Sequence, residues 1–309
     1  MSEGQSPERS RHGVRERWLV TGALGCIGAW TAITLVREGA GVVAFDLGDD
    51  LRRLRLIGSP QEIDAIDFVR GDITELETVE RLLAEHEITH VVHLAALQVP
   101  FCRENPVLGS RVNVTGTVNV FEAVRRLGLA TTIAYASSAA VFDDRGEVAP
   151  KTLYGVYKLA NEGTARIYAD ENGVTSVGLR PFSVYGPGRD QGLTAGPTLA
   201  IAAAVQGEPY RIGFGGSTQL HYARDVAGAF VQAARSTPDG AQAVSLGGPA
   251  TSMAEFAALV ERELPGAQIT HEETPLPFPE QLPEPWFDAP LTPLEQGVRE
   301  TVEILRGVI

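Results

Sequence analysis

The feature that most constrains the fold of this chain is a glycine-rich segment that joins a strand to a helix. Residues 21–28 read TGALGCIG, after the apolar run at 18–21 and before a helical pattern that ends near Arg37. Glycines at this spacing allow a tight turn, close approach of the backbone to a pyrophosphate, and close packing of the helix on the strand. Amide groups at the start of the helix would face the phosphates, although an ordinary strand–helix turn would also explain the glycines alone. The residues that we expect to bind a dinucleotide here are Gly22, Gly25, Cys26, Ile27 and Gly28.

Strand and helix patterns alternate through the first half of the chain. Near-continuous apolar runs indicate buried strands, and apolar residues spaced three and four apart indicate helices. We expect strands at 18–21, 41–46, 67–71, 90–96, 131–137 and 176–179, and helices at 27–37, 75–85, 107–127 and 151–171. This alternation is typical of a parallel sheet that is covered by helices on both faces. The predicted fold class is therefore α/β, a doubly wound parallel sheet of the Rossmann type.

The sequence changes in character beyond Val184, where glycine and proline become frequent and the elements become shorter. We expect helices there at 224–234, 253–263 and 293–306. The stretch 274–293 holds seven prolines and predicts an ordered loop that wraps around the molecule. The expected organisation has three parts: a flexible tail at 1–16, an NAD-binding Rossmann domain at 17–183, and a smaller C-terminal α/β substrate lobe at 184–309, with segments that can interleave.

The composition excludes several classes of partner. The chain has 39 acidic and 26 basic side chains among 309 residues, a net charge of −13. A nucleic-acid binder presents a basic face, so we expect no nucleic-acid partner. No apolar run approaches the roughly 18 residues that a membrane span needs, and the polar N-terminus lacks the apolar part of a signal peptide. Cys26 and Cys102 form neither a disulfide framework nor a metal cluster. We therefore expect a cytoplasmic protein with no membrane association and no metal.

Two aspartates follow strands of the predicted nucleotide domain. Asp46 ends the second strand, 24 positions after Gly22, near the offset of about 20 residues for a ribose-binding carboxylate. Such a carboxylate accepts both ribose hydroxyls and repels a 2′-phosphate, which favours NAD over NADP; a loop-capping role is the alternative. Arg52 and Arg53 follow closely and would weaken that preference if they faced the phosphate. Asp72, after the third strand, is expected near the adenine, with a turn-forming role as the alternative.

Tyr154 and Lys158 stand four residues apart on one predicted helix, so their side chains share a face. The chain has only two lysines, Lys151 and Lys158, whereas Tyr157 has Asn161 four residues later. A tyrosine titrates near 10, and a neighbouring ammonium favours its phenolate. We therefore expect Lys158 to lower the pKa of Tyr154 and to make it available as a base near neutrality.

Taken together, these segments resemble the extended short-chain dehydrogenase/reductases, the NAD-dependent epimerase/dehydratase family. The resemblance runs from about Arg17 to Arg306 and implies NAD as the cofactor. The segments stand in family order: TGALGCIG at 21–28, Asp46, GDI at 71–73, HLAA at 93–96, NVTGT at 113–117, SSAAVF at 137–142, YGVYK at 154–158 and RPFSVYGPG at 180–188. Singly several of them are loose matches, but together and in order they are highly specific.

The resemblance also implies roles for individual residues. Tyr154 would be the catalytic acid/base, Lys158 would hold the nicotinamide ribose, and Ser138 would hydrogen-bond the reacting oxygen, with Ser137 as its neighbouring rival. Asn113 would lie near the active site in a more structural role, and His93 is better explained as a satisfied strand-end histidine than as an acid/base. Further cofactor contacts are implied at Ile73, Leu94, Ala95, Ala96, Asn113 and Pro181.

Departures from the family pattern bear on the reaction. Dehydratases of this family carry an Asp-Glu pair where this chain has Ala139 and Ala140, which transfer no protons, so dehydration is not expected. Ser183 replaces the asparagine usual in sugar-nucleotide enzymes, and Thr218 replaces the arginine that grips a substrate diphosphate. The arginines that would compensate are Arg180, Arg189, Arg211 and Arg224, of which Arg180 and Arg224 are more simply structural.

Three functions therefore compete. We favour an NAD-dependent oxidoreductase that transfers a hydride between NAD and a hydroxyl or carbonyl carbon of a small sugar, polyol or hydroxy acid. The alternative is an NAD-dependent nucleotide-sugar 4-epimerase, which uses the same residues. A non-catalytic nucleotide sensor is the least favoured, because the set of Ser138, Tyr154 and Lys158 is intact. The candidate substrate contacts are Gln98, Ser138, Ser183, Arg189 and His221. The resemblance also implies a homodimer built from the helices that contain Asn113 and Tyr154.

Overall fold

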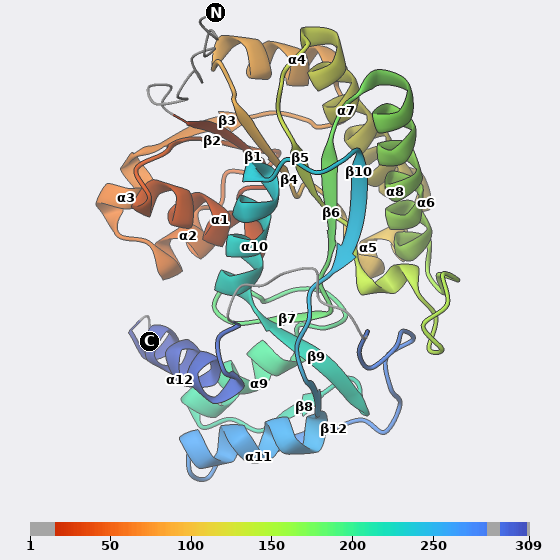
Figure 1. The fold of residues 1–309 in the computed structure, drawn as a ribbon. Coiled ribbons are helices and arrows are strands. Elements are labelled where there is room, and N and C mark those ends of the chain that lie inside the picture. The colour runs from red at the N-terminus through yellow and green to blue at the C-terminus, as the bar shows by residue number, and fades with distance from the viewer. Residues whose placement is uncertain (1–15, 283–290, 308–309) are drawn as a thin grey trace, which may run out of the picture.

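The computed structural model describes residues 16–282 and 291–307, and its centre is a parallel sheet of seven strands in the order β10-β6-β5-β4-β1-β2-β3 (Figure 1). These strands are β1 (Arg17–Thr21), β2 (Gly41–Asp46), β3 (Ile66–Arg70), β4 (His90–His93), β5 (Ile133–Ala136), β6 (Ser176–Arg180) and β10 (Ala241–Ser245). The strand order reverses direction between β1 and β4. In doubly wound sheets, ligands bind at this reversal, outside the carboxyl ends of the strands.

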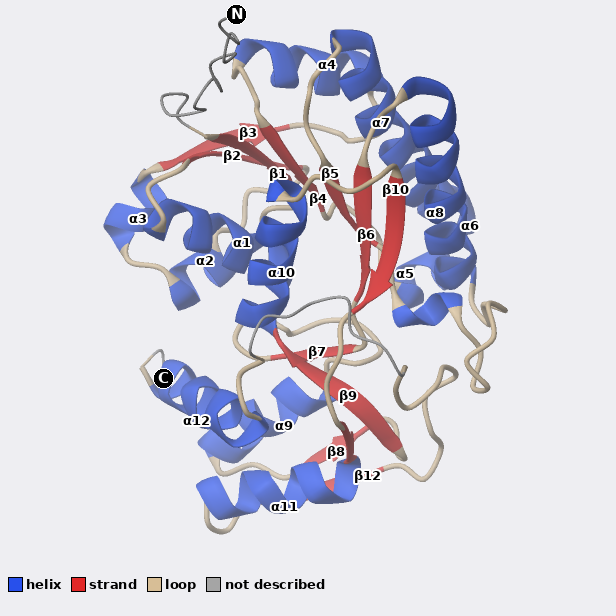
Figure 2. Ribbon diagram, viewed as in Figure 1, coloured by secondary structure: helices blue, strands red, loops and turns tan. Residues whose placement is uncertain are grey.

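Helices cover both faces of this sheet (Figure 2). One face is covered by α1 (Cys26–Arg37), α2 (Arg52–Ile57), α3 (Pro60–Asp64) and α10 (Ala223–Arg235), and the other by α4 (Leu76–Glu85), α7 (Gly116–Leu127) and α8 (Leu153–Asn172). Within β1, Trp18 and Val20 belong to the first hydrophobic core and Leu19 to the second. Because helices cover both faces, the inner strands β1, β4 and β5 are almost fully buried, whereas the edge strand β3 is largely exposed. This arrangement confirms the predicted α/β class.

The C-terminal half forms a smaller lobe but also returns to the sheet. The lobe contains the strands β7 (Ser183–Tyr185), β8 (Tyr210–Ile212), β9 (Ser217–Tyr222), β11 (Ala250–Ser252) and β12 (Ile269–His271) with the helices α9 (Gly196–Gln206), α11 (Met253–Glu263) and α12 (Leu294–Arg306). Between these elements, α10 packs on α1, and β10 pairs in parallel with β6. A cut at residue 183 therefore separates β10 from its sheet, and the two parts interleave.

Two predicted elements differ from the structure. The helix predicted at 107–127 is three pieces: α6 (Pro106–Ser110), a π-helical turn at η1 (Arg111–Thr115), and α7. Such turns occur frequently at functional sites, and this one contains Asn113. The strand predicted at 90–96 ends at His93, and the chain continues as a loop into α5 (Val99–Glu104), which was not predicted.

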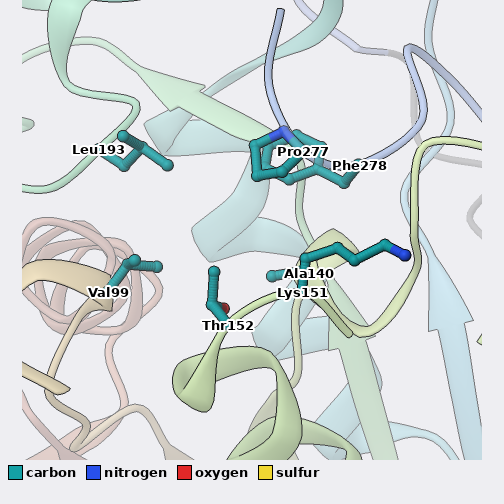
Figure 3. Close-up of a pocket in the computed structure, with 7 residues that line it drawn as sticks. All are labelled: Val99, Ala140, Lys151, Thr152, Leu193, Pro277 and Phe278. Atoms are coloured by element: carbon teal, nitrogen blue, oxygen red, sulfur yellow. The ribbon is translucent and has the colours of Figure 1, made fainter. Parts of the chain in front are cut away.

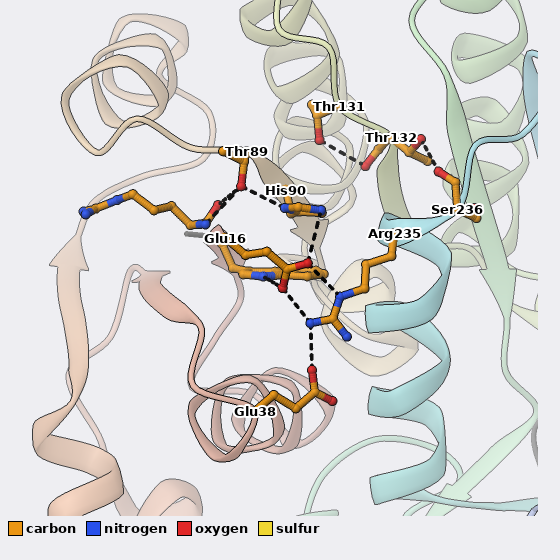
Figure 4. A network of polar contacts seen from close by, with 10 residues as sticks. Glu16, Glu38, Thr89, His90, Thr131, Thr132, Arg235 and Ser236 are labelled. Carbon is orange, nitrogen blue, oxygen red and sulfur yellow. Dashed lines mark hydrogen bonds and ion pairs between the residues drawn. The ribbon is translucent and has the colours of Figure 1, made fainter. Parts of the chain in front are cut away.

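A polar network ties the amino-terminal edge of the sheet together (Figure 4). Arg235 of α10 donates to Glu16 at 2.6 Å and lies 2.7 Å from a carboxylate oxygen of Glu38, which follows α1. The Trp18 ring stacks on His90 with centroids 4.3 Å apart, and the Arg235 guanidinium lies over the same ring. Glu16, which we predicted to be in the flexible tail, is therefore anchored, whereas residues 1–15 lie outside the described part.

The first part of the proline-rich stretch docks on the small lobe. Leu276 is buried, and the amide of Gln219 in β9 donates to the carbonyl of Glu280 at 3.1 Å. This agrees with an ordered, wrapping loop as far as residue 282, and residues 283–290 lie outside the described part. Among the described residues, no helix combines the length and the apolar character that a membrane crossing requires.

Candidate active site

The glycine-rich loop brings two backbone segments into close contact at the carboxyl edge of the sheet. Gly22 has φ +65°, in the left-handed region, and a Cβ there would lie 2.7 Å from the amide nitrogen of Ala95. A Cβ at Gly28 would collide with the carbonyl oxygen of Gly22. No side chain of the described residues caps the start of α1, so its first amides are available to a phosphate. This loop has the shape that a dinucleotide pyrophosphate requires.

Asp46 lies directly beside this loop. Its Oδ2 accepts a hydrogen bond from the amide of Leu24 at 3.0 Å, and its Oδ1 accepts one from Gly48 at 3.1 Å. Each carboxylate oxygen has a second lone-pair site for a ribose hydroxyl. Arg52 and Arg53 both pair with Asp190, at 3.0 and 2.6 Å. The two guanidinium groups that would weaken the preference for NAD are therefore already paired.

Three further cofactor candidates have local contacts of their own. Asp72 accepts the amide of Thr74 at 2.9 Å, which is the turn-forming role that we left open. Ile73 is buried against Gly116 of α7, and Pro181 is buried after β6. The contact of Asp72 with the adenine stays a prediction.

The side chain of Asn113 is hydrogen-bonded to the backbone of the loop that follows β4. It accepts from the amide of Leu97 at 2.7 Å and donates to the carbonyl of the same residue at 2.9 Å. The Thr21 hydroxyl oxygen accepts from the amides of Leu94 and Ala95, both at 3.2 Å. Residues 94–96 are thereby held against Gly22, on the cofactor side of the site. The side chain of Asn113 is fully engaged by this backbone.

His93 is a satisfied interior residue rather than an acid/base. Its ring nitrogens lie 2.7 Å from the Thr21 hydroxyl and 3.0 Å from the Thr117 hydroxyl. Burial lowers the pKa of His93 to about 3, with a smaller contribution from the charge of Lys158. The imidazole is therefore neutral at physiological pH, in agreement with the structural role that we favoured.

Ser138, Tyr154 and Lys158 come together where β5 ends. Ser138 follows β5, and its hydroxyl oxygen accepts from the amide of Ala140 at 3.2 Å. Tyr154 stands in the first turn of α8, and the Lys158 ammonium lies 5.5 Å from its ring centroid. Lys158 is buried and donates to the carbonyl oxygen of Ala136 at 2.7 Å. The three predicted catalytic side chains therefore share one site.

The protonation equilibria of this group differ from our expectation. Burial raises the pKa of Tyr154, while hydrogen bonding to Ser138 and the charge of Arg189 act in the opposite direction. Burial lowers the pKa of Lys158 to about 8. We expected Lys158 to bring the pKa of Tyr154 down, but desolvation of the phenolate is the larger effect here, and the charge that opposes it is that of Arg189.

Ser137 is occupied elsewhere, which distinguishes it from Ser138. Its hydroxyl donates to Glu162 at 2.5 Å, and the same carboxylate pairs with Arg180 at 2.6 Å. The Arg180 guanidinium also lies 4.9 Å from the ring centroid of Phe142. Arg180 is thus a structural residue between α8 and β6 and is not available to a substrate.

Two of the predicted substrate contacts, Ser183 and His221, already have hydrogen-bond partners within the protein. His221 is buried; its Nδ1 accepts from the amide of Phe182 at 3.2 Å, and its Nε2 donates to the carbonyl of Gly247 at 3.0 Å. Burial lowers the pKa of His221 to about 4. The hydroxyls of Ser183 and Thr218 lie 3.0 Å apart in the interior. These side chains join β7 to β9 and to the backbone beside them.

Gln98 and Arg189 both lie close to Gly192. Gly192 has φ +98°; a Cβ there would lie 3.2 Å from the Arg189 guanidinium and would collide with Oε1 of Gln98. Arg189 donates to the Thr194 hydroxyl at 3.1 Å. The Nε of Arg189 and the Oε1 of Gln98 are buried with no hydrogen-bond partner among the described residues. Buried polar atoms normally have partners, so both are candidates to meet a ligand.

Arg189 also differs from the other arginines that could bind an anion. Arg180, Arg211 and Arg224 pair with the carboxylates of Glu162, Glu272 and Glu300, at 2.6, 3.0 and 2.9 Å respectively. In the described ranges, no ion pair links Arg189 to a carboxylate. Of the four arginines, Arg189 alone therefore brings an uncompensated positive charge to the site, beside Tyr154.

A small apolar pocket lies beside the catalytic serine (Figure 3). Leu193, Pro277 and Phe278 from the small lobe face residues of the nucleotide domain: Val99, Ala140, Lys151 and Thr152. The amide of Ala140 donates a hydrogen bond to the Ser138 hydroxyl, and Thr152 caps the helix that contains Tyr154. We did not predict Leu193, Pro277 or Phe278 as site residues. No motif marks them, and only the fold brings the proline-rich stretch to this point.

A doubly wound sheet with a glycine-rich first turn, an acidic end to β2 and a Ser-Tyr-Lys group after β5 defines an enzyme of the extended short-chain dehydrogenase/reductase type. The model of the NAD dependent epimerase/dehydratase family matches residues 18–247, and the chain belongs to that family. This finding confirms the predicted family and the prediction of an NAD-dependent enzyme.

The chain is similar to several 4-epimerases. It is 35% identical over 192 residues to UDP-glucuronate 4-epimerase 2 of Arabidopsis thaliana, covering 58% of this chain and 44% of that protein. It is 32% identical over 231 residues to UDP-glucose 4-epimerase of Mycolicibacterium smegmatis, covering 70% and 72%. The structure of UDP-glucose 4-epimerase of Thermus thermophilus with NAD superposes with a TM-score of 0.79 and 26% identity, covering 95% and 100%. The chain spans about half the length of the Arabidopsis relatives or less, from 40% to 51%.

Proposed function

We propose that the protein is an NAD-dependent oxidoreductase that oxidises a hydroxyl, or reduces the corresponding carbonyl, of a small sugar-, polyol- or hydroxy-acid-like substrate. The observation that carries this proposal is the meeting of Ser138, Tyr154 and Lys158 at the end of β5, beside the glycine-rich loop. Tyr154 takes the hydroxyl proton, and Ser138 hydrogen-bonds the reacting oxygen. NAD, when bound, supplies the hydride acceptor.

The residues of the cofactor end fit NAD. Gly22, Gly25 and Gly28 admit the pyrophosphate, and Asp46 offers its carboxylate to the adenosine ribose. Lys158, fixed by the carbonyl of Ala136, holds the nicotinamide ribose. The walls are supplied by Cys26, Ile27, Asp72, Ile73, Leu94, Ala95, Ala96, Asn113 and Pro181.

Arg189 supports a substrate that carries one anionic group. Its guanidinium acts electrostatically on Tyr154 and has no carboxylate partner among the described residues. A guanidinium binds a carboxylate through two parallel hydrogen bonds, so a hydroxy acid or sugar acid is well suited to this arginine. Gln98, which lies near the same Cβ position of Gly192, offers a neutral hydrogen-bonding group next to this arginine. The pocket beside Ala140, whose lining is mainly apolar and includes Lys151, would take a mainly apolar substituent.

The second candidate is an NAD-dependent nucleotide-sugar 4-epimerase. It is favoured by the similarity to UDP-glucuronate and UDP-glucose 4-epimerases. It is disfavoured by Thr218, which is buried against Ser183, and by the pairing of Arg211 and Arg224 with glutamates. Of the four arginines that could bind a substrate diphosphate, Arg189 alone has no carboxylate partner among the described residues, so it would have to bind the diphosphate by itself.

One assay separates the two candidates. The purified protein with NAD is offered free sugars, polyols, sugar acids, hydroxy acids and UDP-sugars, and both NADH absorbance and product identity are followed. Net NADH formation with a small hydroxyl substrate supports the dehydrogenase. Interconversion of a UDP-sugar pair without accumulation of NADH would replace it by the epimerase.

We also propose that two copies associate through the helical segment that contains Asn113, which begins with α6, and through α8, which contains Tyr154. Val107 and Leu108 of α6 are exposed, and Leu153, Val156, Ala160 and Ile167 form an exposed stripe along α8. Contiguous apolar patches on a protein surface commonly mark interfaces. Light scattering at micromolar concentration should give a dimer mass, and Val156→Asp with Ile167→Asp should give the monomer mass. A monomeric wild-type protein would refute the proposal.

We also propose a cytoplasmic location. Cys26 and Cys102 are free thiols, and reduced cysteines are stable in that compartment. Cell fractionation tests this location.

A further inference from the structure

A polar connection links the cofactor end of the site to the substrate end through Arg53 and Asp190, which the proposed chemistry does not use. Arg53 belongs to α2, and one of its terminal nitrogens donates to the carbonyl oxygen of Leu24 at 2.9 Å. Its Nε donates to the carbonyl of Gly188 at 3.1 Å, and its other terminal nitrogen pairs with Asp190 at 2.6 Å. One guanidinium therefore holds the glycine-rich loop and residues 186–190 together.

The geometry of this junction shows that it is built into the fold. The Arg53 side chain is only 16% exposed, and its stem packs on the open side of Gly188, where a Cβ would lie 3.6 Å away. Arg52 adds a second ion pair to the same carboxylate at 3.0 Å. The Trp30 indole donates to the carbonyl of Pro187 at 3.0 Å. Arg52, Arg53 and Trp30 of the nucleotide domain therefore all contact the 186–190 segment, the two arginines through the side chain of Asp190.

The two ends of the connection reach the two halves of the site. Leu24 contacts Asp46 through its amide and Arg53 through its carbonyl. Asp190 directly follows Arg189, whose amide donates to the carbonyl of Gly186 at 3.1 Å. The position of the 186–190 segment therefore sets where the Arg189 guanidinium lies relative to Tyr154.

We infer that Arg53 and Asp190 are positioning residues that couple binding of NAD on the glycine-rich loop and Asp46 to the placement of Arg189 in the substrate site. Leu24 is hydrogen-bonded to both Asp46 and Arg53, and Arg53 holds the segment that carries Arg189. NAD bound at this loop would therefore act on the position of Arg189 through these contacts. The affinity for an anionic substrate is then higher in the NAD complex, and by linkage the substrate raises the affinity for NAD by the same factor. The substrate half of this inference rests on the proposed function, whereas the loop half does not.

Hydrogen exchange on the full chain tests the loop half without any substrate. Saturating NAD should slow exchange of the amides of Arg189 and Ala195 as well as those of the glycine-rich loop. In Asp190→Asn, the glycine-rich loop should still be protected by NAD, and the protection of Arg189 and Ala195 should be lost. The matched control is Glu272→Gln, which removes a carboxylate from the Arg211 pair at the surface of the small lobe. Protection of Arg189 that persists in Asp190→Asn would overturn the inference.

Kinetics test the substrate half. At saturating NAD, Asp190→Asn should raise the KM for the substrate found in the panel by about tenfold and leave kcat near its wild-type value. Asp190→Glu, which keeps the charge, should restore most of the affinity, whereas a purely structural defect would not respond to charge. An unchanged KM in a folded Asp190→Asn protein contradicts the coupling. If the panel yields no substrate, the proposed function fails, and the exchange experiment alone decides the coupling.

Discussion

At the scale of single residues, hydrogen-bond partners distinguish the roles of residues that are neighbours in the sequence. Ser137 and Ser138 are adjacent, but Ser137 is bonded to Glu162 and Ser138 lies against Tyr154. Tyr157, the rival tyrosine on α8, donates its hydroxyl to the carbonyl of Pro106 at 2.9 Å and so joins α8 to α6. These partners support the choice of Ser138 and Tyr154 for the chemistry.

Asp46 provides the prediction at this scale. Asp46→Asn removes the negative charge that would repel a 2′-phosphate but keeps an oxygen for the amide of Leu24. We expect the preference for NAD over NADP to fall by about tenfold or more, which corresponds to ~1.4 kcal/mol. Calorimetric titration with both cofactors measures the ratio. Asp170→Asn, which neutralises an exposed carboxylate near the end of α8, is the control and should leave the ratio unchanged; an unchanged ratio in Asp46→Asn would remove Asp46 from the cofactor site.

At the scale of elements, the glycine-rich turn depends on a close approach as well as on backbone conformation. Gly22→Ala should weaken NAD binding by at least about tenfold, since the new methyl group would meet the backbone of Ala95 at 2.7 Å and displace the loop. Gly39→Ala is the matched control, because Gly39 also has positive φ but nothing lies within 4 Å of its Cβ position. Both variants carry backbone strain, and only the first should lose NAD. Equal NAD affinity in the two variants would show that the contact with Ala95 does not matter.

Elements whose signals are local could be predicted from the sequence. The helix predicted at 253–263 is α11 as observed, because a capping box between Ser252 and Glu255 starts it and an apolar face follows. The π-helical turn at Arg111–Thr115 could not be predicted, since one extra residue per turn barely alters the apolar pattern of a long helix. Ser183 and His221 were predicted as substrate contacts, and their hydrogen bonds within the protein could not be predicted for a related reason. Their partners, Thr218 and Gly247, lie 35 and 26 residues away, and only the pairing of β7 with β9 decides which way they point.

At the scale of the whole molecule, the sequence predicts a large and a small part whose segments can interleave, but it does not indicate which segment returns to the large sheet. β10 completes the sheet beside β6 although the small lobe begins before it. Nothing in the run Ala241–Ser245 distinguishes a strand of the large sheet from a strand of the lobe. The candidate site was predictable where it depends on family-like motifs, and unpredictable where Leu193, Pro277 and Phe278 close it.

Two buried histidines make the stability of the whole molecule depend on pH. The pKa of His93 is lowered to about 3 and that of His221 to about 4, both mainly by burial. A histidine titrates near 6.5 in an unfolded chain, so below that pH the unfolded state takes up protons that the folded state does not. The free energy of unfolding should therefore fall as the pH falls from about 6.5 towards 4, by up to about 1.4 kcal/mol per pH unit for each histidine.

Urea denaturation at a series of pH values measures this dependence. His221→Gln, which keeps a hydrogen-bonding side chain without a titrating group, should show a shallower slope between about pH 6.5 and 4.5 than the wild type. The partly exposed His86 supplies the control variant His86→Gln, whose slope should match that of the wild type. A free energy of unfolding that stays constant through this range would contradict the burial of both imidazoles as neutral groups.

The most direct test of the proposed chemistry is the steady-state turnover of Tyr154→Phe. The substitution deletes the hydroxyl beside Ser138 and keeps the ring that lies against Lys158, so the fold and NAD affinity should be preserved. Tyr157→Phe, which removes a hydroxyl from the next turn of the same helix, is the matched control and should keep its turnover. Tyr154→Phe should lower kcat on the identified substrate by about 10² to 10⁴, the usual contribution of general acid–base catalysis. Turnover close to that of the wild type would show that Tyr154 does not transfer the proton.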